Sequence, residues 1–77
     1  MHGRLASSLL YLNALKSTLP NIFQLMTRKD LADFAGLSTE STVKLLKGFE
    51  KEGLVELQEK DIVLHDVDHL KEIQKRG

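Results

Sequence analysis

One face of the segment 38–52 carries small, acidic and basic side chains that could bind the edges of nucleic-acid bases. Glu40 can accept a hydrogen bond from cytosine N4, and Lys44 can donate to O6 and N7 of guanine. On a helical wheel these side chains lie opposite the apolar residues of the same segment, so a helix here would bury one face and present the other. The residues that this pattern predicts to read base edges are Thr39, Glu40, Val43 and Lys44.

A second group of residues has the chemistry to bind backbone phosphates. Thr27, Arg28 and Lys29 open another expected helix, where backbone N–H groups and basic side chains favour an anion. Lys60 falls at the tip of an expected hairpin, a place from which a side chain can reach the nucleic-acid backbone. The residues predicted to contact phosphate are Thr27, Arg28, Lys29, Ser38, Lys47, Lys51 and Lys60.

The overall charge leaves an alternative open. The chain has 11 basic and 11 acidic residues and a formal net charge of zero, which counts against a strong non-specific grip on nucleic acid. Glu40 and Lys44, four residues apart, could form an ordinary solvated ion pair worth a few tenths of a kcal/mol. A domain of the same fold that contacts protein and does not bind DNA is therefore the alternative hypothesis. DNA binding would have to depend on local charge placement, or on two copies acting together.

The composition excludes several other functions. With 77 residues we expect a single domain spanning 1–77, and without cysteine there are no disulfides or thiolate metal sites. The serines lack a histidine and an acid at a persuasive spacing, and no glycine-rich phosphate loop is present, so we expect no enzyme activity and no cofactor. The stretch His65–His69 holds ligand-type residues but suits a helix start, so we expect no metal site.

Apolar runs are only a few residues long, and the beginning of the chain does not resemble a signal peptide. We therefore expect no membrane contact and a cytoplasmic location.

Capping and turn signals place these residues on helices and a hairpin. Thr27 and Ser38 are suited to cap helices, Gly36 to reverse the chain between them, and Gly53 to end the second. The expected helices span about 4–17, 27–35, 38–52 and 66–75, with a hairpin wing over about 54–64 and a short β-like run at Ile22–Leu25. The order predicts a mainly α fold with a small β-hairpin wing, that is, a winged helix-turn-helix.

The apolar residues predict how these elements pack. The positions expected to lock the two helices around the turn are Leu31, Ala35, Leu37, Thr42 and Leu45. We expect the Thr42 hydroxyl to bond back to the Ser38 carbonyl, and the bulk of the core to come from Phe23, Phe34 and Phe49. The first helix is apolar almost all the way round, which predicts two packing partners, one of them outside this chain.

Three stretches resemble the C-terminal domain of the Crp/Fnr family of bacterial transcription regulators: RLASSLLYL, LMTRKDLADFAGLSTESTVKLLKGFEKEGLVEL and DIVLHDVDHLKEI. The resemblance implies that the helix after the turn reads double-stranded DNA as part of a symmetric homodimer, with Glu40 matching the base-reading glutamate. Lys44 stands where an arginine is usual in the family, and a lysine ammonium cannot donate the two parallel hydrogen bonds of an arginine guanidinium. Thr39 stands where some members carry an arginine that reads guanine.

The resemblance also implies that the chain is the C-terminal piece of a longer regulator, in which an N-terminal domain binds an effector and switches DNA affinity. RNA polymerase is a further candidate partner. The operator and the effector stay open.

Overall fold

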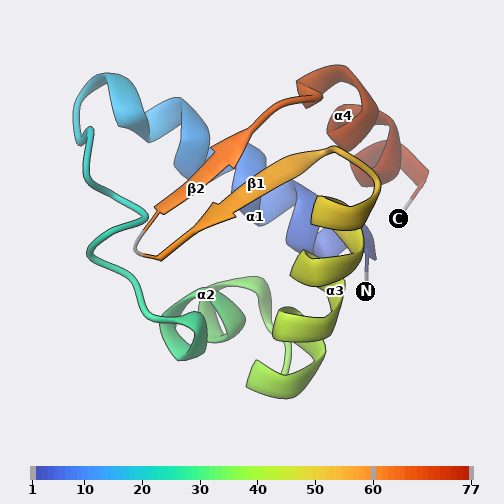
Figure 1. Cartoon of the computed structure of the whole chain (residues 1–77), viewed down its shortest axis with the longest axis horizontal. Helices are drawn as coiled ribbons and strands as arrows, with labels where there is room; N and C mark the ends of the chain where they lie inside the picture. The colour runs from blue at the N-terminus through green and yellow to red at the C-terminus, as the bar shows by residue number, and fades with distance from the viewer. Residues whose placement is uncertain (1, 60, 77) are drawn as a thin grey trace.

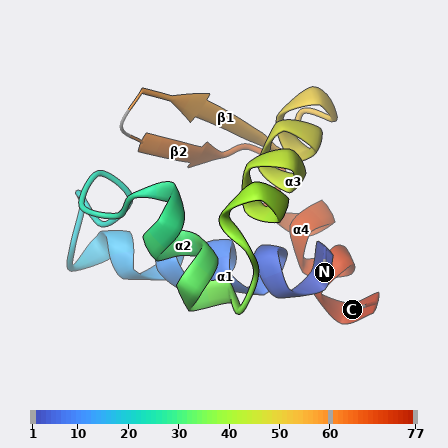
Figure 2. The ribbon, with the colours of Figure 1, turned by 90° about the horizontal axis from the view of Figure 1, so that it is seen from below.

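Helices make up most of the fold, and a single β-hairpin completes it. A computed structural model describes residues 2–59 and 61–76. The elements in chain order are α1 (His2–Ala14), the 3₁₀ helix η1 (Leu15–Ser17), α2 (Arg28–Ala35), α3 (Thr39–Lys51), β1 (Val55–Gln58), β2 (Asp61–Leu64) and α4 (Val67–Arg76). Figure 1 shows this order, and Figure 2 shows α1 along one side of the molecule and the hairpin along the other. The predicted winged helix-turn-helix is confirmed.

Local hydrogen bonds define the two helices around the turn. At the start of α2, the Thr27 hydroxyl accepts from the Asp30 amide at 3.1 Å, and the Asp30 carboxylate accepts from the Thr27 amide at 3.0 Å. Gly36 then ends α2 with a φ of 73°, a left-handed conformation that favours glycine. Ser38 caps α3 by accepting from the Ser41 amide at 3.1 Å. The predicted caps and turn are therefore confirmed.

The core lies where α1, α2, α3, the hairpin and α4 meet. Its largest fully buried side chains are Phe49, Leu5, Leu9, Leu31, Leu46, Leu54, Ile62 and Leu70. The central helix is α1, which packs against α4 as well as against α2 and α3. Most of the broad apolar surface of α1 is therefore covered within the chain, while Tyr11 stays 58% exposed. A contact of α1 outside the chain remains a prediction.

The β-like run expected at Ile22–Leu25 is wrong. The chain forms helical turns there, because the amides of Gln24 and Leu25 both donate to the Asn21 carbonyl, at 2.9 and 3.1 Å. Pro20 has a backbone angle suited to starting such a turn. Phe23 is buried and Leu25 is exposed, as a turn of helix against the core produces.

Phe34 is a second departure from expectation, because it does not belong to the core. Its side chain is 48% exposed, whereas Phe23 and Phe49 are buried as predicted. Only Leu31, Ala32 and Ala35 of α2 are buried, since this short helix contacts the rest of the fold along a narrow stripe. The Phe34 ring instead lies on the surface beside the ring of Tyr11, with centroids 5.8 Å apart.

The hydrogen bond expected from the Thr42 hydroxyl to the Ser38 carbonyl is also wrong. That carbonyl accepts from the backbone amide of Thr42, at 3.0 Å. The Thr42 side chain is fully buried, and its Oγ1 has no hydrogen-bond partner among the described residues. An unsatisfied buried hydroxyl costs about 1–3 kcal/mol.

Thr42→Val should therefore stabilise the fold. Valine has a similar shape and a similar helix propensity but no hydroxyl, so we expect the free energy of unfolding to rise by about 1 kcal/mol. Urea unfolding followed by circular dichroism measures the change. Ser41→Val, at the half-buried neighbouring position, is the control and should not stabilise the fold. A lower unfolding midpoint for Thr42→Val would show that the hydroxyl is satisfied in solution.

Candidate nucleic-acid interface

The outer face of α3 is open to solvent along its whole length. Thr42, Leu46 and Phe49 on the inner face are buried in the core. Of the predicted base-reading residues, Thr39, Glu40 and Lys44 are exposed and Val43 is half-buried. The same face carries the two predicted phosphate contacts Lys47 and Lys51, both exposed. The structure therefore brings the small, acidic and basic groups of α3 together on one continuous surface.

The ion pair between Glu40 and Lys44 forms, with Oε1 and Nζ 3.3 Å apart. Their side chains are 81% and 75% exposed, so the pair is worth only a few tenths of a kcal/mol. Such a weak pair can open when a base edge offers each group a better partner. The solvated ion pair and a base-reading role are therefore compatible for these two residues.

The basic side chains near the turn differ in whether they already form an ion pair within the protein. Lys47 and Lys51 form no ion pair within the described part of the chain, so their charges are available to an anion. Lys29 pairs with Asp33 at 3.3 Å, also in an exposed position. Arg28 is half-buried at the start of α2.

The capping box limits how the start of α2 can bind phosphate. The amides of Thr27 and Asp30 already have acceptors in that box. A phosphate at this helix end would therefore meet the amides and side chains of Arg28 and Lys29. Thr27 would contribute by holding the first turn of α2 in place as its N-cap. In the same way, the Ser38 hydroxyl is engaged with the Ser41 amide at the start of α3.

Asp30 makes the stability of this helix start depend on pH. Hydrogen bonds from the Thr27 backbone and then the Thr27 side chain, helped by the charge of Lys29, hold the pKa of Asp30 below its ordinary value. The carboxylate thus stabilises the fold above the ordinary pKa, and this contribution is lost as pH falls through the lower, folded-state value.

Asp30→Asn should therefore weaken the acid sensitivity of the fold. Between about pH 5 and pH 2 we expect the urea unfolding midpoint of the native chain to fall more than that of the variant. Asp68→Asn, which changes an exposed first-turn residue of α4, is the matched control. Equal acid sensitivity of the native chain and Asp30→Asn would contradict the effect of the cap.

Two acidic side chains of the wing are exposed to solvent. Glu56 and Glu59 are exposed, and hydrogen bonds from Gln58 and then His65 lower the pKa of Glu56. Strands β1 and β2 pair in antiparallel register from Val55↔Leu64 to Gln58↔Asp61, so Gln58 is the last residue of β1. Lys60, the predicted phosphate contact at the tip, lies outside the described residues.

Glu59, which follows β1, lies close to the start of α2. Glu59 lines an open hollow of about 380 Å³ together with Thr27, Arg28 and the preceding turn. Two contacts that the sequence pattern did not predict hold the wing: the Lys16 ammonium binds the Ile62 carbonyl, and the Glu50 carboxylate binds the Leu57 amide. Lys16 belongs to η1 and its partner lies 46 residues away, so no local pattern in the sequence predicts the contact.

Two other properties of the described residues concern metal binding and the crossing of a membrane. Asp66 caps α4 by accepting from the His69 amide at 3.0 Å, as predicted, and His65 pairs with Glu56 at 3.2 Å. Within residues 2–59 and 61–76 there is no group of three or more histidine, aspartate or glutamate residues arranged to hold a metal ion. In the same ranges, none of the helices has the length and apolar character that a membrane crossing requires.

Comparison with known proteins agrees with this architecture. No curated protein sequence matches the chain. The family model of the Crp-like helix-turn-helix domain matches residues 3–73, which include the turn and the hairpin and reach from α1 into α4. This family is a class of DNA-binding domains found in transcription regulators and is not a class of enzymes. The chain belongs to the family of Crp-like helix-turn-helix domains.

Proposed function

We propose that the chain is the sequence-specific DNA-binding domain of a bacterial Crp/Fnr-type transcription regulator and that α3 enters the major groove. The observation that carries the proposal is the two-sided character of α3. Thr42, Leu46 and Phe49 anchor it in the core, while its other face presents donors and acceptors from its N-terminal end onward. The N-terminal residues of a recognition helix are those that reach base edges.

In this arrangement, the two ends of α3 have different roles. Glu40 accepts from a cytosine and Lys44 donates to a guanine, while Thr39 and Val43 contact neighbouring base edges or methyl groups. Lys47 and Lys51, further along α3, bind phosphates, as does the start of α2 at Arg28 and Lys29. The remaining members of the proposed phosphate set are Thr27, Ser38 and Lys60.

The zero net charge favours binding by two copies. One domain carries no net positive charge, so we expect its affinity alone to be low, and the part of that affinity that comes from phosphate contacts to fall as salt is added. We infer that the domain acts within a longer homodimeric regulator, in which two copies bind two half-sites about one helical turn apart. A cytoplasmic location and contact with RNA polymerase are part of this proposal.

The direct test is a titration of the chain with a pool of short random DNA duplexes at low salt, followed by backbone amide NMR. We expect the amides of residues 27–29 and 38–51 to shift together and to return toward their free positions as salt is added. Amides of α4 serve as the internal control. If the α3 amides stay still both in the monomer and in a covalently linked dimer, the proposal fails.

Contact with a protein is the second candidate, and the exposed Tyr11–Phe34 ring pair favours it. This candidate predicts no DNA-induced shifts even at low salt and retention of a partner through α3 or through the ring pair. The two candidates therefore separate in the same titration.

Glu40→Ala should change sequence preference more than overall affinity. Losing the acceptor for one cytosine should reduce discrimination at one base pair by about 1–3 kcal/mol. Selection from a randomised duplex library, done with the native chain and the variant as linked dimers, measures the preference at each position. Glu72→Ala, an exposed glutamate on α4, is the control. An unchanged preference profile for Glu40→Ala would remove this residue from the base-reading set.

A further inference from the structure

One residue pair of the β1–β2 hairpin forms hydrogen bonds with side chains on both outer edges of the hairpin. Leu57 and Ile62 face each other in the register of β1 and β2. The Leu57 amide donates to Oε2 of Glu50 at 3.1 Å, and the Ile62 carbonyl accepts from Nζ of Lys16 at 3.0 Å. The outward N–H and C=O groups of a two-stranded ribbon have no strand partner. Here α3 supplies one partner and η1 supplies the other.

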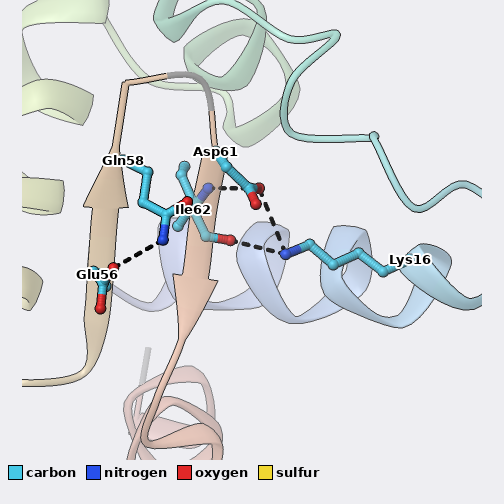
Figure 3. A network of polar contacts seen from close by, with 5 residues as sticks. All are labelled: Lys16, Glu56, Gln58, Asp61 and Ile62. Carbon is cyan, nitrogen blue, oxygen red and sulfur yellow. Dashed lines mark hydrogen bonds and ion pairs between the residues drawn. The ribbon is translucent and has the colours of Figure 1, made fainter.

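The contact at the β2 edge is a small network (Figure 3). Nζ of Lys16 lies 3.6 Å from Oδ1 of Asp61 and 5.0 Å from the centre of the Phe23 ring. The same Asp61 oxygen accepts from the Ile62 amide at 2.8 Å. The Lys16 and Asp61 side chains are only 26% and 24% exposed, so their charges are less screened than those of a surface pair.

Among the described residues no further strand lies beside β2, and the wing packs on the core through Val55 and Ile62. An isolated two-stranded hairpin is marginal in water. The segment before α2, where a third strand was expected, forms helical turns and does not pair with the wing. Hydrogen bonds to ionised side chains are stronger than neutral ones, so two of them at one residue pair can replace part of what a neighbouring strand would supply.

We propose that Lys16 and Glu50 are positioning residues that set the angle between the wing and α3, so that the strands of the wing and α3 approach the same DNA site. Glu50 belongs to the helix whose outer face is proposed to read bases, and Glu59, which follows β1, lies beside the start of α2. This inference rests on the proposed function for its DNA part. The holding of the wing itself is independent of DNA.

The first experiment measures amide hydrogen exchange. In Lys16→Met, which keeps an unbranched apolar side chain but removes the ammonium group, and in Glu50→Ala, the Leu57 amide should exchange about tenfold faster. The Leu46 amide in the core should keep its rate, and the urea midpoint should change little. Lys16→Arg and Glu50→Gln retain a donor and an acceptor and should restore slow exchange. Glu52→Ala, an exposed neighbour at the end of α3, is the matched control.

The second experiment measures the affinity of linked dimers for a selected duplex. Lys16→Met and Glu50→Ala should each weaken binding by about three- to tenfold, and the two conservative variants should restore it. The proposal is overturned if the Leu57 amide of the variants exchanges at the native rate, or if it exchanges faster while the DNA affinity is unchanged. It is also overturned if the variants lose affinity only in proportion to a fall in their urea unfolding midpoint. If the native chain itself fails to bind any duplex, the proposed function fails, while the exchange rates still decide whether these residues hold the wing.

Discussion

Phe49→Ala is expected to lower the free energy of unfolding by about 3–5 kcal/mol, a large share of what a domain of this size possesses. The ring is 1% exposed and belongs to the core cluster together with Leu5, Leu9 and Leu54. Truncation removes most of its contacts and leaves a cavity that the surrounding helices can close only in part. Urea unfolding followed by circular dichroism measures the loss. If Phe49→Ala is unfolded in water, Phe49→Leu, for which we expect a smaller loss, is measured in its place.

The same truncation at Phe34 is the matched control. Phe34 is 48% exposed on the surface of α2, and its ring lies beside the ring of Tyr11. We expect Phe34→Ala to cost less than about 1 kcal/mol, the scale of an exposed aromatic pair. Similar losses for the two variants would mean that α2 packs more deeply than the structure shows.

Reversing two charges on α3 should produce the largest loss of DNA binding. In Lys47→Glu/Lys51→Glu, two proposed phosphate contacts become repulsive. We expect affinity at low salt to fall on the order of 100-fold, because each phosphate-neutralising cation contributes to counterion release. The slope of log affinity against log salt should become shallower by about two for each copy of the domain. Fluorescence anisotropy of a labelled duplex at several salt concentrations measures both quantities.

The control makes the same change of net charge on another helix. Lys71→Glu/Lys75→Glu alters two exposed lysines of α4, which lies against α1 and away from the outer face of α3. This variant should lose far less affinity and keep the salt slope. Equal losses in the two variants would show that net charge, and not contact by α3, governs binding.

The sequence by itself determined the helix-turn-helix and the two faces of α3. The cap at Thr27, the turn at Gly36 and the cap at Ser38 each depend on residues a few positions apart, so their hydrogen bonds follow from local geometry. The inner and outer faces of α3 follow from helical periodicity alone. For the same reason, the residues proposed to read bases follow from the sequence without any tertiary contact.

Only the tertiary structure decided which apolar and charged residues are used in long-range contacts. Burial depends on what packs against a residue, so the chain alone could not show that Phe34 stays on the surface or that the Thr42 hydroxyl is left without a partner. The pairing of Lys16 with Ile62 joins residues 46 positions apart, and no periodicity reports such a contact. Local hydrogen bonds and helical periodicity leave a trace in the sequence, whereas the neighbours that the fold brings together do not.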